Sequence, residues 1–172
     1  MSKYLELLTP QNSQLIFIDQ QPQMAFGVQS MDRQALKNNV VALAKAAKVF
    51  NIPTTITTVE TEGFSGPTYP ELLAVFPEHK LLERSSMNSW DDQNVRDALA
   101  AAGRKKVVVS GNWTEVCNTT FALSAMLEGG YEIYMVADAS GGISVEAHKY
   151  AMVHKATERV AHGQRIGPNP AR

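Results

Sequence analysis

The chain has 172 residues, of which 44% are hydrophobic and 19% charged, and its formal net charge is −1. This length suits one globular domain with a buried core, so we expect residues 1–172 to form a single domain with an irregular tail at 163–172. The near-neutral charge, without a basic block, argues against nucleic acid or an anionic membrane as the main partner. One cysteine allows no intrachain disulfide. Because no signal-peptide core or long apolar run is present, we expect a cytoplasmic protein.

Short apolar or β-branched runs alternate with amphipathic segments along the chain. Strands are expected at 15–18, 54–59, 80–83, 107–110 and 131–137, and helices near 36–47, 70–75, 95–102, 116–127 and 145–156. Such alternation is typical of βαβ units. We therefore predict an α/β fold, a single-domain three-layer sandwich with a mainly parallel sheet of five to six strands and helices on both faces.

Local signals predict where several elements begin and end. Asp32 or Ser30 can cap the first long helix, and Ser89 can cap the helix near 95–102. Gly103 is expected to end that helix. The segment 22–31 is expected to be a loop, because it separates the first strand from the first helical periodicity.

The only cysteine lies in residues 111–117, Gly-Asn-Trp-Thr-Glu-Val-Cys, between the strand at 107–110 and a helix. Cys117 falls in the first turn of that predicted helix, where unpaired N–H groups and the helix dipole favour a thiolate. A cysteine in such a place can act as a nucleophile. A lone cysteine is nevertheless more often a buried structural residue.

Three polar residues stand at or just beyond the carboxyl ends of predicted strands: Asp19, Arg84 and Cys117. Ligands of open parallel sheets bind outside this edge. A carboxylate directly after the apolar run Leu-Ile-Phe-Ile is costly to bury unless it is paired, and Arg84 is its natural partner. These residues therefore form a candidate site, although the Asp19–Arg84 pair could also be purely structural.

With these residues in place, the chain resembles the isochorismatase-like cysteine hydrolases, a superfamily that includes nicotinamidases and N-carbamoylsarcosine amidases. It looks closest to the YcaC-type branch. The motifs that carry the resemblance lie, in family order, at residues 15–21, 53–58, 84–91, 111–117 and 136–141. The cysteine motif together with the aspartate after the first strand is the specific part of this pattern.

The resemblance implies a catalytic triad. Cys117 would attack a carbonyl or amide carbon and form a thioester-type intermediate, while Asp19 would take the thiol proton and later give it to the leaving group. The third member in the family is a lysine, and here Arg84 stands in its place. A guanidinium can stabilise charge and orient Asp19, but it cannot shuttle a proton.

The resemblance also implies an oxyanion hole and a pocket. After a non-proline cis peptide at residues 112–113, the backbone N–H groups of Trp113 and Cys117 would point at one site. The candidate pocket residues are Gln21, Phe26, Met87, Trp90 and Asn118. Trp90 and Trp113 are equally consistent with the core. The size and polarity of the pocket depend on the loops 22–31, 60–69 and 85–90.

Two departures from the family pattern shape the remaining expectations. Nicotinamidases hold zinc with an aspartate and histidines beyond the second strand, whereas residues 58–66 contain no histidine. We therefore expect no metal and no organic cofactor. The family usually adds a sixth strand, and no apolar strand is evident after residue 154. A homo-oligomer is expected from the resemblance alone.

Two functions from different classes fit these observations. The first is a cysteine-dependent hydrolase of a small amide or related C–N bond, with a small molecule as substrate. The alternative is a non-catalytic member of the same fold that binds a small ligand or senses oxidants through Cys117.

Overall fold

The computed structural model describes residues 6–161, with side-chain surroundings up to residue 153. A parallel sheet in the order β3-β2-β1-β4-β5 forms its centre. Its strands are β1 (Ser13–Ile18), β2 (Thr54–Val59), β3 (Leu82–Arg84), β4 (Lys106–Gly111) and β5 (Glu132–Met135). The predicted α/β class and parallel sheet are confirmed. The predicted tail at 163–172 lies outside the described residues.

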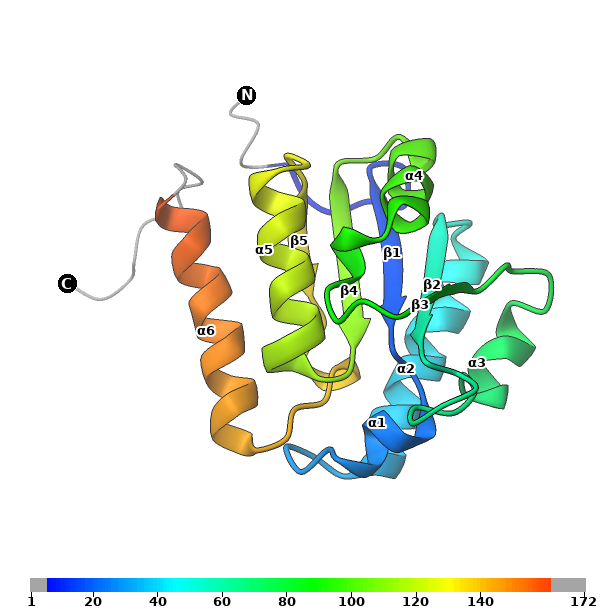
Figure 1. The fold of residues 1–172 in the computed structure, drawn as a ribbon. Coiled ribbons are helices and arrows are strands. Elements are labelled where there is room, and N and C mark those ends of the chain that lie inside the picture. The colour runs from blue at the N-terminus through cyan, green and yellow to red at the C-terminus, as the bar shows by residue number, and fades with distance from the viewer. Residues whose placement is uncertain (1–5, 162–172) are drawn as a thin grey trace.

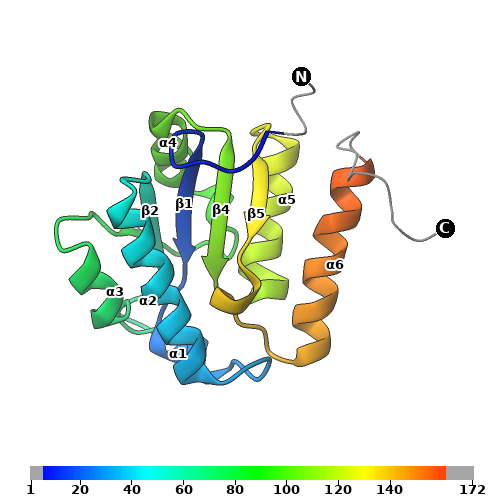
Figure 2. The ribbon, with the colours of Figure 1, turned by 180° about the vertical axis from the view of Figure 1, so that it is seen from behind.

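Helices cover both faces of this sheet. They are α1 (Pro22–Phe26), α2 (Arg33–Val49), α3 (Pro70–Val75), α4 (Gln93–Ala102), α5 (Thr119–Leu127) and α6 (Val145–Ala161). The helices α4 and α5 lie on one face and α2 and α3 on the other, while α6 runs alongside α5 (Figures 1 and 2). The short α1 sits at the carboxyl-end edge of the strands. No helix in residues 6–161 combines the length and apolarity that a membrane crossing requires.

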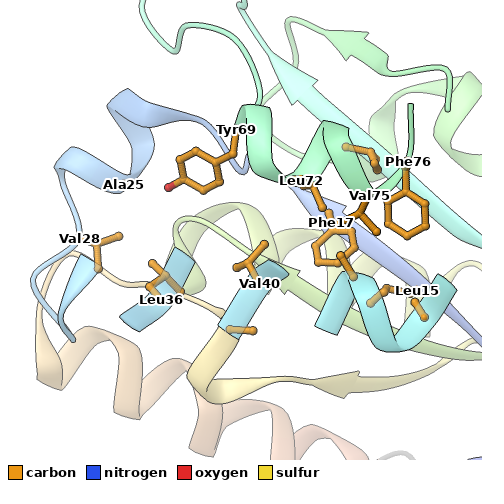
Figure 3. Packing of buried hydrophobic residues seen from close by; sticks show 14 residues of the cluster. Leu15, Phe17, Ala25, Val28, Leu36, Val40, Tyr69, Leu72, Val75 and Phe76 are labelled. Atoms are coloured by element: carbon orange, nitrogen blue, oxygen red, sulfur yellow. The ribbon is translucent and has the colours of Figure 1, made fainter. Parts of the chain in front are cut away.

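The central strand β1 divides the core into two clusters. Its six residues are all buried, as expected for a parallel strand that is covered on both faces. Leu15 and Phe17 pack with residues of α2 and α3, and Figure 3 shows Phe17 among these side chains. Ile16 and Ile18 belong to the second cluster, beneath α4 and α5. The alternation of side chains along β1 therefore joins the two layers.

Several predicted boundaries are confirmed. Asp32 caps α2, because its Oδ1 accepts a hydrogen bond of 2.8 Å from the N–H of Ala35. The helix α3 spans the predicted residues Pro70–Val75. Gly103 ends α4 in the left-handed region, with φ of 67°, where glycine is the favoured residue.

Two local predictions were wrong. The segment 22–31 contains α1, which Pro22 can begin because the first N–H of a helix needs no partner. Ser89 does not cap α4: it begins a 3₁₀ turn, Ser89–Asp91. The cap is Asp92, whose carboxylate accepts hydrogen bonds from the N–H groups of Asn94 and Val95. The cap is thus the carboxylate of Asp92, three residues after the serine whose hydroxyl we expected to form it.

The sheet order brings the ends of β1 and β4 together. Ile18 at the end of β1 lies opposite Gly111 at the end of β4 and opposite Thr57 of β2. The chain leaves β1 and β4 toward opposite faces of the sheet, and such a switch point is where open α/β sheets bind ligands. Asp19, the residue after Ile18, is therefore placed beside the segment that carries Cys117.

Candidate active site

Asp19 is held directly beyond the end of β1. Its backbone adopts a φ of 54°, and its N–H donates to the carbonyl of Thr57 at 3.1 Å. The carboxylate is fully buried, and Oδ2 accepts a hydrogen bond of 2.8 Å from Nη2 of Arg84. The other oxygen, Oδ1, accepts no hydrogen bond from a nitrogen or oxygen donor of the described residues, and the thiol of Cys117 lies within reach of the carboxylate. One face of this buried carboxylate is therefore available to a reacting group.

Arg84 is the last residue of β3 and reaches past the end of β2 to Asp19. Its side chain is only 1% exposed. Besides Asp19, the guanidinium donates to Oγ of Ser89 at 3.1 Å and to the carbonyls of Thr58 and Met87 at 3.4 Å each. The ion pair that the sequence predicted is present, and its remaining donors are directed to neighbouring backbone and hydroxyl groups. Arg84 is thus a fixed positive charge behind Asp19.

Cys117 lies in a π-helical turn, Thr114–Asn118, that leads into α5. The sequence predicted a regular α-helical first turn, and this detail was wrong. Single π turns are frequent at functional sites, because the wider turn redirects a side chain. Cys117 is 4% exposed, and the N–H of Trp113 is directed at its sulfur. The peptide bond between Asn112 and Trp113 is cis.

The π turn is tied to three other segments. The Asn118 amide donates to the carbonyl of Gly111 at 3.0 Å, which links the turn to the end of β4. The N–H of Thr114 donates to the carbonyl of Gly141 at 2.8 Å, and Oγ1 of Thr114 lies 2.8 Å from Nδ1 of His148 on α6. Hydrogen bonds to these segments therefore fix the position of the turn that carries Cys117.

The buried thiol of Cys117 and the buried carboxylate of Asp19 both have raised pKa values. Burial raises the pKa of Cys117 to about 12, with the nearby Asp19 carboxylate as the second cause. Burial also raises the pKa of Asp19 above its usual value, and the attraction of Arg84 opposes this only in part. Burial and the Asp19 carboxylate thus oppose the stabilisation of a thiolate that we expected at a helix start. Both shifts disfavour the state in which the thiol and the carboxylate are ionised at the same time.

A cavity of about 240 Å³ opens beside this pair. It is lined by Asp19, Met24, Val59, Glu60, Phe64, Ser65, Ser85, Met87, Trp113, Val116 and Cys117. The lining includes residues of all three loops that the sequence singled out, 22–31, 60–69 and 85–90. The volume is close to the lower end of the range for small-molecule sites, about 300–1,000 Å³. The nucleophile candidate and the base candidate thus share one small, largely apolar space.

Some of the expected pocket residues line this cavity and others do not. Met87 and Trp113 line it, and Nε1 of Trp113 donates to the carbonyl of Met24 at 2.8 Å. Phe26 points away, with 71% of its surface exposed and the guanidinium of Arg33 4.9 Å from the centre of its ring. Asn118 is absent from the lining, because its amide binds Gly111.

Gln21 and Trp90 are structural neighbours of the site. The Gln21 amide exchanges hydrogen bonds with the backbone N–H and carbonyl of Val59, which fixes the chain after β1 against the end of β2. Trp90 packs edge-on against Phe121 and Tyr131. Trp90 is therefore a core residue, and it does not line the cavity.

Seven lining residues were not predicted: Met24, Val59, Glu60, Phe64, Ser65, Ser85 and Val116. Val59 could have been found, because it ends the second predicted strand at the same edge as Asp19. The other six depend on loop conformations or on the π turn, which the hydrophobic pattern does not encode. In the described side chains, no group of three or more His, Cys, Asp or Glu residues could hold a metal ion.

Comparison with known proteins agrees with this geometry. Residues 13–162 match the family model described as the isochorismatase domain. The chain belongs to the isochorismatase family. It is 37% identical to the probable hydrolase YcaC of Escherichia coli (strain K12) over 142 residues, which are 82% of this chain and 68% of that protein. The family assignment therefore covers both the Asp19 and the Cys117 segments.

Two solved structures of family members have the same fold. The crystal structure of E. coli YcaC, an octameric hydrolase of unknown specificity, has a TM-score of 0.83 at 34% identity and covers 87% of this chain and 74% of its own. YcaC of Pseudomonas aeruginosa, solved with hexane-2,5-diol and covalent acrylamide, has a TM-score of 0.85 at 32% identity and covers 89% and 76%. This isochorismatase-family chain thus shares most of the architecture of the YcaC proteins.

Proposed function

We propose that this isochorismatase-family protein is a cysteine-dependent hydrolase of a small amide or related C–N bond. The observation that carries the proposal is the placement of Cys117 next to Asp19 at one cavity, with Arg84 locked behind the carboxylate. A thiol, a base within reach and a group that orients the base are the parts required for covalent acyl transfer.

The first half of the reaction would form a thioester. The sulfur of Cys117 attacks the amide carbon while its proton passes to Asp19, which gives a tetrahedral oxyanion. The C–N bond then breaks, and Asp19 returns the proton to the departing nitrogen. The amine or ammonia leaves, and the acyl group stays on the sulfur.

The second half would restore the enzyme. Water attacks the thioester carbon and gives a proton to Asp19. The C–S bond breaks, the acid is released, and the thiolate takes the proton from Asp19. No group is oxidised or reduced, so the cycle needs only water as co-substrate.

Arg84 and the backbone would support the charges that develop. Arg84 favours the ionised form of Asp19 against the effect of burial, because it is a compensating charge 2.8 Å away. The N–H groups of Trp113 and Cys117 are the proposed donors to the oxyanion. Such donors are each worth about 2.7–4 kcal/mol in acyl transfer.

One relative supports the presence of a reactive nucleophile in this fold. The P. aeruginosa YcaC structure contains acrylamide in covalent form, and acrylamide is an electrophile that nucleophiles attack at its C=C bond. Of the two non-catalytic alternatives, a ligand-binding protein and a thiol sensor, the sensor is less well supported. Sensor cysteines are exposed and have low pKa values, whereas burial raises the pKa of Cys117 to about 12. We also propose a homo-oligomer, since the E. coli relative is octameric.

Release of ammonia from a panel of small primary amides tests the function. We expect turnover by the natural chain and none above background by Cys117→Ala, with both proteins showing the same thermal unfolding profile. Quenched reactions of the natural chain should contain an acyl adduct on Cys117, detectable by mass spectrometry. Turnover that survives Cys117→Ala would contradict the proposal.

A further inference from the structure

We propose that the cavity selects against anionic substrates and that Glu60 is the residue that sets this selection. This inference rests on the proposed function, because it names the class of amide that would be used: compact, apolar and either uncharged or cationic, without a carboxylate near the reacting group.

The charged side chains that line the cavity are both acidic. Among its described lining residues these are Asp19, at the inner end, and Glu60. Six further lining residues are apolar: Met24, Val59, Phe64, Met87, Trp113 and Val116. A substrate carboxylate would therefore lose its hydration and meet negative charge at both ends of an apolar space, which is unfavourable.

Arg84 does not offset this charge for a ligand. Its guanidinium is 1% exposed and is not part of the cavity lining. Its hydrogen bonds go to Asp19, Ser89, Thr58 and Met87. An arginine that anchors substrate carboxylates presents a free planar fork to the cavity. Here that fork is directed at the protein, so Arg84 offsets the charge of Asp19 only in part, from the side away from the cavity, and leaves Glu60 uncompensated.

The backbone around Glu60 holds its carboxylate near the entrance. The residue has a φ of 49°, and its N–H donates to the carbonyl of Arg84 at 3.2 Å. Its carbonyl accepts hydrogen bonds from the N–H groups of Gly63 and Ser65, at 3.0 and 3.3 Å. These hydrogen bonds close the turn that begins at Glu60 and link it to the end of β3. The backbone that carries the exposed Glu60 side chain is therefore held at the entrance.

The size of the cavity adds a second restriction. A volume of about 240 Å³ equals the liquid volume of about eight water molecules. Such a space holds an amide with a short aliphatic or small ring body. The hydroxyls of Ser65 and Ser85 are the other polar side chains of the lining, and they can bind neutral donors and acceptors.

Alkylation of the single cysteine tests the charge selection without any turnover. The rate ratio of neutral iodoacetamide to anionic iodoacetate is measured for the folded protein at low ionic strength and divided by the same ratio for N-acetylcysteinamide. We expect this quotient to be on the order of ten, because two acidic groups repel the anion. In 1 M salt, where the Debye length falls to about 3 Å, it should shrink markedly.

Glu60→Gln should lower this quotient by about threefold, since it removes one of the two charges. Glu62→Gln is the matched control: it removes an equal charge from an exposed position of the same loop that does not line the cavity, and it should leave the quotient unchanged. A quotient of one or below in the natural chain, or no change in Glu60→Gln, would overturn the proposal.

A second measurement separates this inference from the hydrolase function. Ammonia release is compared for pentanamide, 4-aminobutanamide and succinamate, which have similar lengths and differ in charge. We expect pentanamide and 4-aminobutanamide to be used at least tenfold better than succinamate. If succinamate is used as well as the other two amides, the charge selection is overturned, whereas the proposed hydrolase function remains supported. If alkylation is selective but no amide is hydrolysed, the hydrolase function is contradicted, whereas the charge selection remains supported.

Discussion

The thiol of Cys117 and the carboxylate of Asp19 share a buried space in which two negative charges would be costly. Activation by a permanently lowered thiol pKa is therefore not the mechanism that this site supports. The proton can instead move from sulfur to Asp19 as the new bond forms, so that the total charge of the pair stays constant. General-base catalysis of this type contributes about 10²–10⁴-fold.

The pH profile of turnover follows from these shifts. Burial raises the pKa of Asp19, and the base must be deprotonated to accept the thiol proton. We expect kcat/KM to fall as the pH drops through that raised value, above the usual value of about 3.9 for aspartate. No alkaline limb is expected below about pH 10, because the Cys117 pKa is about 12. A profile that rises with slope one from pH 6 to 9 would contradict this account.

Substitutions of Arg84 test whether it acts through charge or through geometry. Arg84→Met leaves the Asp19 carboxylate buried without a partner, and breaking a buried pair in this way costs about 3–5 kcal/mol of the free energy of unfolding. Arg84→Lys keeps the charge but loses the planar set of hydrogen bonds, so it should retain more stability and part of the activity. Chemical denaturation and amide turnover measure both. Equal stability of the two variants would contradict a role for the charge.

At the scale of elements, the π turn and the end of β4 fit tightly around Gly111. A Cβ at this position would lie 2.2 Å from Oδ1 of Asn118 and 2.6 Å from the carbonyl oxygen of Ile18. The backbone of β1 cannot move without disturbing the sheet. Gly111 therefore lets the cysteine-bearing turn approach the strand that carries Asp19.

Gly111→Ala should destabilise the fold by about 1–3 kcal/mol, the usual range for forced overpacking, and should reduce turnover further by shifting Cys117. Gly63→Ala is the control, because its nearest contact would be an ordinary 3.5 Å to Glu60. Thermal unfolding and alkylation rates of both variants are the measurements. An unchanged Gly111→Ala protein would show that the close approach is not required.

The elements also show what the sequence could predict. The run Leu-Ile-Phe-Ile predicted a doubly covered strand, and the placement of Asp19 and Cys117 after β1 and β4 predicted their meeting once the sheet order was known. The π turn could not be predicted, because its apolar spacing is that of an ordinary helix. The loop at residues 60–65 could not either, since its course depends on backbone hydrogen bonds that begin at Glu60.

At the scale of the whole molecule, α6 offers a face for assembly. Val145, Tyr150 and Val153 on this helix are 58%, 69% and 53% exposed, and α6 lies outside α5, away from the sheet (Figure 1). Exposed apolar side chains gathered on one element are typical of protein interfaces. Together with the octameric relative, this face supports the proposed homo-oligomer. The single domain and the cytoplasmic location stay predictions.

Light scattering of the purified protein tests the assembly. We expect a mass that is a multiple of one chain, and Tyr150→Glu should lower it if α6 is buried between copies. Val49→Glu is the control, because Val49 is 74% exposed at the end of α2. A monomeric mass for the natural chain, or equal effects of the two variants, would contradict the assignment of α6.

Transfer of the Cys117 proton to Asp19 is the central step of the proposed mechanism. The measurement that tests it most directly is the pH dependence of iodoacetamide alkylation between about pH 5 and 9.5, for the natural chain and for Asp19→Asn. If one proton is shared by the pair, the thiolate fraction is nearly constant over neutral pH, so the natural chain should show a plateau. In Asp19→Asn the rate should rise tenfold per pH unit. The same tenfold rise in both proteins would contradict the account.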